Sequence, residues 1–436
     1  MTMGKVMRLL FHSIFFVLVI SGCICSGEVY LKISKTGQGK VSCAIPRFYY
    51  DGAGQEQLRS NSLEKQLRHD LEFSGYFFTN FPEQELNRLI SLEKRVSALS
   101  PGIWKRLGAE IVVKAKVVAS PDSLKGWLYV FNAADGAPIF AKKYIIGKDE
   151  FISLVHLMSD DIIYNIFGEK GFSNAKIVFI SNRTGAKEVY VSDYDGRNVI
   201  RVTKDNSIIV SPLWSRSNKQ LLYTSFRYDL PRIILHDFTT GERKILSKFP
   251  GLNACGPFAP QGDAVLMVLS RDGNPEIYRF DLSTLQPTRL TRTKAVEASP
   301  CWSPDGRKIA YVSDISGRPQ IYVMDRNGKN NRRLTYKGYY NADPDWSPKG
   351  DEIVYSKRNG RGAVLSVISL DTGTDLPLKT GAGQAEDPSW APDGRHVVYS
   401  YRQNKRYGLY MIDVLSGEKR VILDTKGDEI TPSFTW

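Results

Sequence analysis

Hydrophobic and polar residues alternate along most of the chain in short runs, which Gly, Pro, Asn and Asp separate. The stretch SPDGRKIAYVSD at 303–314 is typical of these runs. Asp305-Gly306 predicts a tight hairpin turn, because both residues tolerate the backbone angles that such turns require. Ile309 and Tyr311 then alternate with other residues as in a half-buried strand. The pattern therefore predicts antiparallel β-structure.

This stretch recurs at a fixed interval. An aromatic residue lies at six positions that are 44 residues apart, namely Trp214, Phe258, Trp302, Trp346, Trp390 and Phe434. A proline precedes most of them by two positions, but Gly256 takes that place in one repeat. A period of this length, with four short strands in each unit, is the pattern of β-propeller blades. We interpret the recurring aromatic as a residue that packs between neighbouring blades.

The two ends of the repeat array complement each other. The final phrase TPSFTW, at 431–436, supplies an inner strand without its three following strands. Residues 175–203, at the front of the array, supply three strands without an inner one. We therefore predict that the C-terminal strand joins residues 176–203 in one blade. This closes a six-bladed ring and leaves no free sheet edge at the junction.

The region before the repeats predicts a smaller α/β domain. Its strands are expected at 29–33, 40–48, 110–119, 124–133 and 137–146, and its helices near 63–71, 86–96 and 149–167. The predicted fold is thus an α/β N-terminal domain over residues 28–170, followed by an all-β six-bladed propeller over residues 171–436, closed by the C-terminal strand.

The first 27 residues read as a signal peptide. Lys5 and Arg8 precede a short apolar run, and small residues follow it, with cleavage expected before Glu28. An alternative is the phrase ISGC at 20–23, which resembles a bacterial lipobox and would leave a lipid on Cys23. Either outcome places the mature protein outside the cytoplasm, and we expect it in the periplasm.

The net charge of +13 does not indicate nucleic-acid binding, because the charges are spread through the blades without a basic cluster. An acidic partner or an anionic envelope surface suits this charge better. The three cysteines after the leader, Cys43, Cys255 and Cys301, are too few for a disulfide framework, and we interpret them as small buried residues.

No motif predicts catalysis. The chain contains no nucleophile elbow of the type G-x-S-x-G, and its histidines lack metal-ligand spacing. His156 lies on a predicted helix, where a structural hydrogen bond is the favoured interpretation. The Asp-Gly pairs are explained by hairpin turns. We therefore predict a protein that is not an enzyme and that carries no cofactor and no metal.

Several phrases resemble the TolB family of the Tol-Pal envelope system. DLEFSGYF at 70–77 resembles the family's DL-x-x-SG-x-F element, and WKRLGAEIVVKAKV at 104–117 resembles its W-x-x-x-GAD-x-VV segment. Residues 155–172 resemble its H-x-x-x-D helix, through His156 and Asp160. The departures are Ala115 or Lys116 in place of a family Gly, and the APQG turn with Gly256 in the third blade.

The resemblance implies a monomeric protein whose propeller binds Pal, the peptidoglycan-associated lipoprotein, and whose N-terminal segment meets the inner-membrane protein TolA. The expected Pal residues lie in loops at the mouth of the central channel, and the expected TolA residues lie in the predicted first strand. The two sets are Leu252, Asn253, Cys255, Glu297, Ala298, Asn341 and Glu429 for Pal, and Glu28, Val29, Tyr30 and Leu31 for TolA. The alternative function is an exported propeller that binds a small ligand or an ion in its channel.

Overall fold

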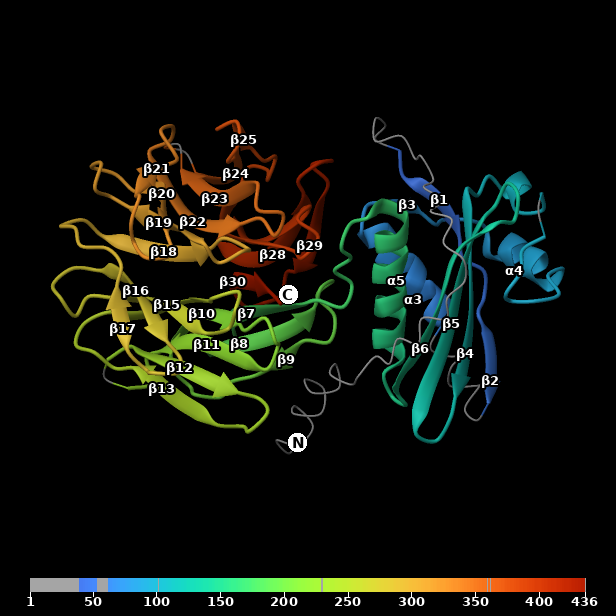
Figure 1. Cartoon of the computed structure of the whole chain (residues 1–436), viewed down its shortest axis with the longest axis horizontal. Helices are drawn as coiled ribbons and strands as arrows, with labels where there is room; N and C mark the ends of the chain where they lie inside the picture. Colours follow the sequence, from blue (N-terminus) through green and yellow to red (C-terminus); the bar gives the residue numbers. More distant parts are fainter. Residues whose placement is uncertain are drawn as a thin grey trace. The chain divides into compact units, whose positions relative to one another are not determined.

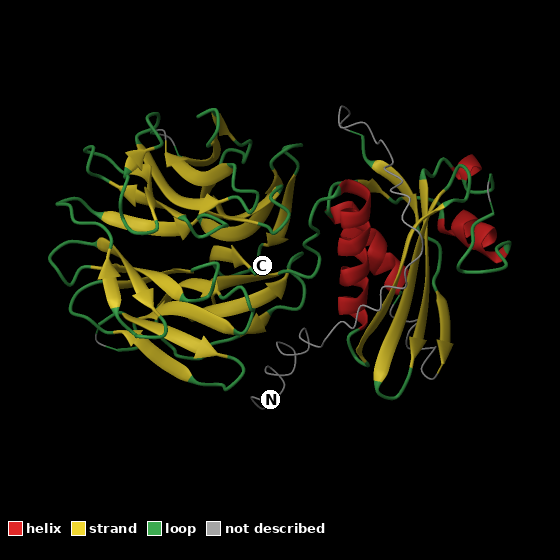
Figure 2. Cartoon of the chain, viewed as in Figure 1, coloured by secondary structure: helices red, strands yellow, loops and turns green. Residues whose placement is uncertain are grey.

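The computed structural model describes residues 39–52, 62–100, 102–228, 230–358, 360 and 362–435. The described chain divides between Asn174 and Ala175 into two compact units, an α/β unit and a propeller unit (Figures 1 and 2). The predicted leader, including Cys23, and the predicted first strand at 29–33 lie outside the described residues.

The α/β unit contains one mixed sheet with the strand order β3-β1-β4-β5-β6, and β2 also pairs with β4. Its elements are β1 (Val41–Ala44), β2 (Tyr49–Gly52), α3 (Leu63–Phe73), β3 (Phe77–Phe78), α4 (Glu83–Ser91), the 3-10 helix η1 (Lys105–Leu107), β4 (Ile111–Ala119), β5 (Ser123–Asn132), β6 (Pro138–Gly147) and α5 (Phe151–Phe167). The strand predicted at 40–48 is shorter than expected: β1 ends at Ala44, before Pro46, which has no N–H for a sheet ladder, and the next strand, β2, begins only at Tyr49. Helix α4 ends at Ser91, earlier than predicted.

Helices cover both faces of this sheet (Figure 1). On one face, α3 and α5 pack their leucines, such as Leu67 and Leu154, against Val113 of β4. On the other face, Leu86 of α4 and the fully buried Trp104 pack around Phe131 of β5. Each helix has an apolar stripe at helical spacing, and the sheet between the helices is buried on both sides.

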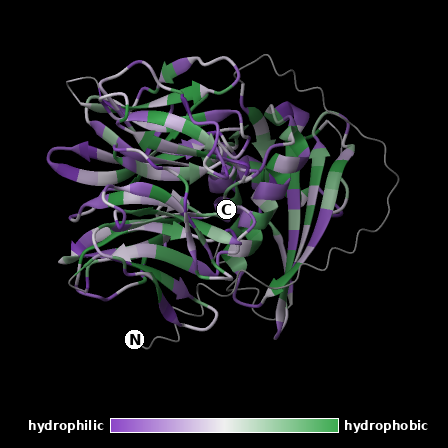
Figure 3. Cartoon of the chain, turned by 60° about the vertical axis from the view of Figure 1, so that its left-hand side comes forward, coloured by the Kyte–Doolittle hydropathy of each residue, from purple (hydrophilic) through white to green (hydrophobic). Residues whose placement is uncertain are grey.

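Each propeller blade is a four-stranded antiparallel sheet, whose strands we name A to D from the channel outwards. The described strands of blades 1 to 3 are β30 (Glu429–Phe434), β7 (Lys176–Thr184), β8 (Ala186–Asp193) and β9 (Ile200–Arg201); β10 (Ile209–Trp214), β11 (Gln220–Ser225), β12 (Arg232–Asp237) and β13 (Arg243–Ser247); and β14 (Asn253–Phe258), β15 (Ala264–Leu269), β16 (Glu276–Asp281) and β17 (Pro287–Arg289). Those of blades 4 to 6 are β18 (Glu297–Trp302), β19 (Lys308–Ser313), β20 (Gln320–Asp325) and β21 (Arg332–Arg333); β22 (Tyr340–Trp346), β23 (Glu352–Arg358), β24 (Ala363–Ser369) and β25 (Asp375–Pro377); and β26 (Gln384–Trp390), β27 (His396–Gln403), β28 (Arg406–Asp413) and β29 (Lys419–Leu423). Hydrophobic residues are concentrated in the strands (Figure 3).

Strand β30 confirms the predicted closure. It pairs in antiparallel register with β7, with Glu429 opposite Ser181 and Phe434 opposite Ile177. Blade 1 therefore takes its A strand from the C-terminal end of the chain and its other strands from the start of the propeller unit.

The A strands tolerate proline because their inner edge lines the channel and pairs with no further strand. In five blades, the residue before this proline has a positive φ, and the ladder shifts register there; these residues are Ser211, Ser299, Asp343, Asp387 and Thr431. In blade 3, Gly256 replaces the proline, and Cys255 stays paired with Met267. A Cβ at Gly256 would lie 3.0 Å from the Cβ of Leu266, so the position favours glycine.

The recurring aromatic packs between neighbouring blades, as predicted. Trp302 of blade 4, for example, lies in one cluster with Leu266 and Ile277 of blade 3. Hydrogen bonds reinforce two further junctions at the same level. The Asp345 carboxylate accepts the backbone N–H of Trp390 at 2.7 Å, and the Ser389 hydroxyl accepts that of Phe434 at 3.3 Å.

Candidate protein-binding end of the propeller

The D-to-A and B-to-C connections of all blades lie at one end of the propeller, because successive strands in a blade are antiparallel. We call this the loop end. The opposite end, the turn end, carries the A-to-B turns and the C-to-D turns. The predicted Pal-binding residues are all near the loop end, where the A strands begin.

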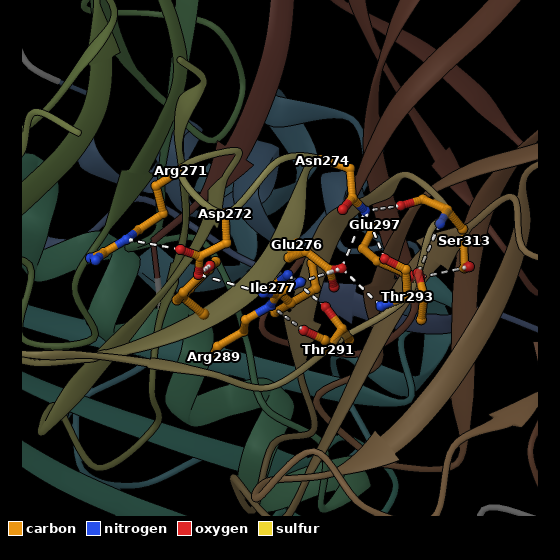
Figure 4. Close-up of polar contacts among 12 residues, drawn as sticks. Arg271, Asp272, Asn274, Glu276, Ile277, Arg289, Thr291, Thr293, Glu297 and Ser313 are labelled. Carbon is orange, nitrogen blue, oxygen red and sulfur yellow. Dashed lines mark hydrogen bonds and ion pairs between the residues drawn. The ribbon is translucent and has the colours of Figure 1, made fainter. Parts of the chain in front are cut away.

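Six of these seven residues lie in A strands and not in loops, contrary to the prediction. Asn253, Glu297 and Glu429 are the first residues of their A strands and Asn341 is the second, and all four are between 0% and 1% exposed. Each of these side chains makes at least one hydrogen bond within the protein, as Figure 4 shows for Glu297, while Glu297 Oε2, Asn341 Oδ1 and Glu429 Oε2 have no partner. A direct contact between these side chains and a partner is therefore excluded in this conformation.

The remaining predicted residues differ in exposure. Leu252, which precedes β14, and Ala298, the second residue of β18, are both half-buried and remain candidates for contact with a partner. Cys255 is buried, and its thiol donates to the carbonyl oxygen of Ser211 at 2.9 Å. Burial raises the pKa of Cys255 to about 12, so this thiol is not a nucleophile. Glu28, Val29, Tyr30 and Leu31 lie outside the described residues.

The buried polar residues form repeated networks between blades. Asn341 donates from Nδ2 to Gln320 Oε1 at 2.9 Å, and the Thr335 hydroxyl donates to the same oxygen. Asn253 accepts the Ser247 hydroxyl and donates to the carbonyl oxygen of Phe249. These bonds fix the D-to-A connections relative to the strands, so the loop end has a defined shape.

The loop end also exposes large apolar side chains that the sequence analysis missed. Within the described part of the propeller, eight lie in its connections, namely Ile208, Phe226, Tyr228, Leu230, Val296, Ile315, Tyr336 and Tyr339. Only Leu285 and Leu415 are comparable at the described turn end. Ile208 and Val296 each precede the first A-strand residue and are two 44-residue steps apart, so the repeat register could have identified them.

Arginines stack on aromatic rings in the same region. The guanidinium carbon lies 4.1 Å from the ring centroid in three pairs, Arg232 with Tyr228, Arg271 with Phe249, and Arg318 with Tyr339. Stacking of this kind holds a cation and an apolar ring together at the surface. The loop end of blades 2 to 5 is therefore both apolar and basic, a combination that suits a protein surface with acidic groups.

The central channel contains a cavity of about 240 Å³, lined by A-strand residues of all six blades. Asp343 and Asp387 are adjacent members of this lining, and their carboxylates accept the hydroxyls of Ser299 and Ser400. Burial, and then the charge of Asp343, raises the pKa of Asp387 to about 7. Toward the turn end, Arg216 donates to the carbonyl oxygen of Pro304 at 3.3 Å.

His156, which the sequence analysis singled out, forms a buried contact between two helices. His156 Nδ1 lies 2.7 Å from Asp70 Oδ2, and the pair joins α5 to α3 inside the α/β unit. This supports the structural interpretation of His156. In the described ranges, no group of three or more His, Cys, Asp or Glu side chains is arranged to hold a metal ion. None of the described helices is long and apolar enough to cross a membrane.

Comparison with known families agrees with this architecture. Residues 164–436 match the TolB beta propeller domain, and residues 29–139 match the TolB amino-terminal domain. The chain belongs to the TolB family. The crystal structure of TolB from Acinetobacter baumannii superposes with a TM-score of 0.76 and 26% identity, over 91% of this chain and 97% of that one.

Curated TolB relatives match over shorter segments. The Tol-Pal system protein TolB of Geobacter sulfurreducens is 33% identical over 220 residues, which is 49% of each chain. That of Desulfosudis oleivorans is 30% identical over 256 residues, or 57% of each chain. The chain thus spans about half the length of the curated TolB relatives it matches.

Proposed function

We propose that this chain is a non-enzymatic, periplasmic component of a Tol-Pal system. In this proposal, the loop end of the propeller binds a Pal-like peptidoglycan-associated lipoprotein, and residues 28–37 bind a TolA-like inner-membrane protein. The link between the two membranes would serve outer-membrane integrity and constriction during cell division. Membership of the TolB family and the names of its Tol-Pal relatives support the system.

The observation that carries the Pal-binding surface is that large apolar side chains are exposed more often at the loop end than at the turn end. Tyr336 is 73% exposed and Val296 is 46% exposed, although both belong to a well-packed propeller. Apolar groups gathered on one face of a folded domain are typical of a protein interface, particularly when arginine and tyrosine accompany them. The turn end offers short Asp-Gly turns and few such groups.

Calorimetry with the soluble domain of the lipoprotein tests this surface. The double substitution of Val296→Asp and Ile315→Asp should weaken binding by on the order of 2–4 kcal/mol, because both side chains are exposed in adjoining connections of the loop end. Leu415→Asp is the matched control at the turn end, where Leu415 is also strongly exposed. Wild-type affinity of the double variant would place the binding surface elsewhere.

The location is tested separately by the intact mass of the protein from cells. We propose a mature chain that begins at Glu28, whereas a diacylated Cys23 is the alternative. A mass that still includes residues 1–27 would contradict both forms.

A second candidate function is the binding of a small ligand or an ion in the channel. The observation that favours it is the pair Asp343 and Asp387 beside the cavity of about 240 Å³. Native mass spectrometry of the purified protein distinguishes the candidates. A bound small molecule or ion without any affinity for the lipoprotein would favour channel binding, and the reverse would favour the Tol-Pal role.

A further inference from the structure

Residues 168–174, which we call the connecting segment, join helix α5 to the propeller unit, which begins at Ala175. Gly168 ends α5 with a φ of 71°, a conformation that glycine adopts readily. From there the chain turns back, so that the Ser173 hydroxyl meets the Ser159 hydroxyl about two helical turns before the end of α5. The connecting segment therefore runs back along the helix before it enters the propeller.

Asp160 of α5 binds the backbone of the connecting segment. Its Oδ1 accepts the N–H of Ser173 at 2.9 Å, and its Oδ2 accepts the N–H of Asn174 at 3.4 Å. Ser173 is 3% exposed, and its hydroxyl donates to that of Ser159 at 3.2 Å. Hydrogen bonds from backbone N–H groups to a carboxylate are stronger than those between neutral groups. One side chain thus fixes the last two residues of the connecting segment.

Gly171 and Phe172 add packing to these hydrogen bonds. A Cβ on Gly171 would lie 2.2 Å from Asp160 Oδ1 and 2.6 Å from Asp160 Cα, so a side chain fits there only if the backbone moves. Phe172 is 3% exposed, and its ring centroid lies 6.2 Å from that of Phe73 on α3. The connecting segment is therefore held by a close backbone approach and by a buried aromatic ring.

The propeller unit fixes the chain again almost immediately. Lys176, the first residue of β7, donates its N–H to the Thr435 hydroxyl at 2.8 Å, and its Nζ lies 2.6 Å from Asp193 Oδ1. Asn174 is thus bonded within the α/β unit and Lys176 within the propeller unit. In sequence, only Ala175 lies between these two points.

We propose that Asp160 acts as a latch on the connecting segment. While the latch is closed, the backbone bonds around Ala175 are the hinge between the two units. When it opens, residues 169–175 become a longer linker, and a flexible chain of this length has an end-to-end distance of about 15 Å. A few residues that absorb changes in φ and ψ are enough for a hinge. This latch does not rest on the proposed function.

The neighbouring acid, Asp161, provides a matched control on the same helix. Its carboxylate accepts the Tyr144 hydroxyl at 2.7 Å and lies 2.7 Å from Lys142 Nζ, and both partners belong to β6. Loss of the Asp161 carboxylate should weaken the contact of α5 with the sheet, whereas loss of the Asp160 carboxylate should free the connecting segment.

Limited digestion of the full chain with trypsin tests the latch, because Lys170 lies in the connecting segment. Cleavage requires the flanking residues to leave α5, so its rate follows the population of the open state. Asp160→Ala should be cleaved after Lys170 roughly 10- to 100-fold faster than the wild type, since two hydrogen bonds to a charged group are lost. Asp161→Ala should be cleaved there at the wild-type rate. A wild-type rate in Asp160→Ala, or equal acceleration in both variants, would overturn the latch.

Gly171→Ala opens the latch from the other side, because its added Cβ would overlap Asp160 while every hydrogen-bonding group remains. Hydrogen exchange, measured by mass spectrometry on the peptide that contains Ser173 and Asn174, should be faster in Gly171→Ala and in Asp160→Ala than in the wild type. Asp161→Ala should exchange there as the wild type does. If Asp160→Ala does not fold, the Gly171→Ala result decides, and unchanged exchange in that variant would contradict the latch.

Electron–electron distance measurements between two spin labels test the hinge itself. Lys148→Cys and Leu415→Cys place the labels at exposed positions, one in each unit, and the described native cysteines are buried. The distribution of label distances should be broader with Asp160→Ala than without it, and Asp161→Ala should leave its width unchanged. Equal widths with and without Asp160→Ala would refute a role of the latch in the movement of the two units.

Discussion

The α/β unit and the propeller use buried polar groups in different ways. In the α/β unit, each such contact occurs once. Lys114 is almost fully buried on β4 and donates to the carbonyl oxygens of Arg95 and Ala98, and the His156–Asp70 pair joins two helices. In the propeller, the same kind of contact recurs at successive junctions, with different residues at the same repeat position. When such a contact is lost from the α/β unit, no equivalent contact remains, whereas in the propeller the equivalent contacts at other junctions remain.

The exception in the propeller is its closure, because only blade 1 is assembled from both ends of the unit. Nearest-neighbour interactions hold a repeat array together, and a ring adds one further interface that removes both free edges. The closing strand should thus matter more than any single junction.

Deletion of residues 431–436 tests this expectation and should have the largest effect. It removes most of β30, including the buried Phe434, and exposes the edge of β7. We expect a loss greater than the about 3–5 kcal/mol of a single buried phenylalanine. In differential scanning calorimetry, the propeller transition should disappear or move far down while that of the α/β unit persists. An unchanged propeller transition would show that closure is dispensable.

Asp70→Ala addresses the unique contact of the α/β unit. The substitution removes the partner of a nearly buried histidine and should destabilise this unit by about 3 kcal/mol. Asp70→Asn, which retains a hydrogen-bonding oxygen, is the control and should cost less. Equal losses in both variants would mean that the hydrogen bond to His156 does not matter.

Asp345 and Ser389 occupy equivalent positions at two blade junctions, so substitutions at the two positions distinguish the effect of charge from that of hydrogen bonding. Ser389→Ala should cost about 1 kcal/mol at every pH. Burial raises the pKa of Asp345 to about 6, so its folded-state proton stabilises the protein at acidic pH and is lost as the pH rises through this value.

The free energy of unfolding of Asp345→Asn, relative to that of the wild type, should therefore rise by about 1–3 kcal/mol between about pH 4 and about pH 7. Urea titrations at both pH values measure this. A difference between variant and wild type that does not vary with pH would indicate an ordinary, ionised Asp345.

Removal of residues 28–35 should have the smallest effect on stability. We expect both unfolding transitions to stay within about 0.5 kcal/mol of the wild type, while affinity for a TolA-like protein falls. Binding assays with the soluble TolA domain check the second part. Unaltered binding would favour an ordinary edge strand for this segment.

The propeller could be predicted well from the sequence because the same packing residue recurs at the same position in six repeats. Trp302 and its equivalents mark the junctions, and the incomplete repeats at the two ends reveal the closure. The site was harder to predict. Polar residues such as Glu297 and Asn341 suggested exposed loops, but hydrogen-bond partners that the fold brings close, such as Ser313 for Glu297 and Gln320 for Asn341, made their burial possible. The exposed Phe226 and Tyr339 lie in connections that differ between blades, so no periodic signal marks them.

Strand β30 also has a consequence for the order of folding. Arg183 and Glu429, which form an ion pair across the closing sheet, are 246 residues apart in sequence. In each of the other blades, the four strands are consecutive in sequence, so their pairing contacts join residues that are synthesised close together in time. Strand β7 is the first propeller strand to be synthesised, and its inner edge stays unpaired until β30 has been synthesised. Contacts so distant in sequence form slowly. We therefore expect the propeller to be most prone to aggregation in the interval before β7 and β30 pair.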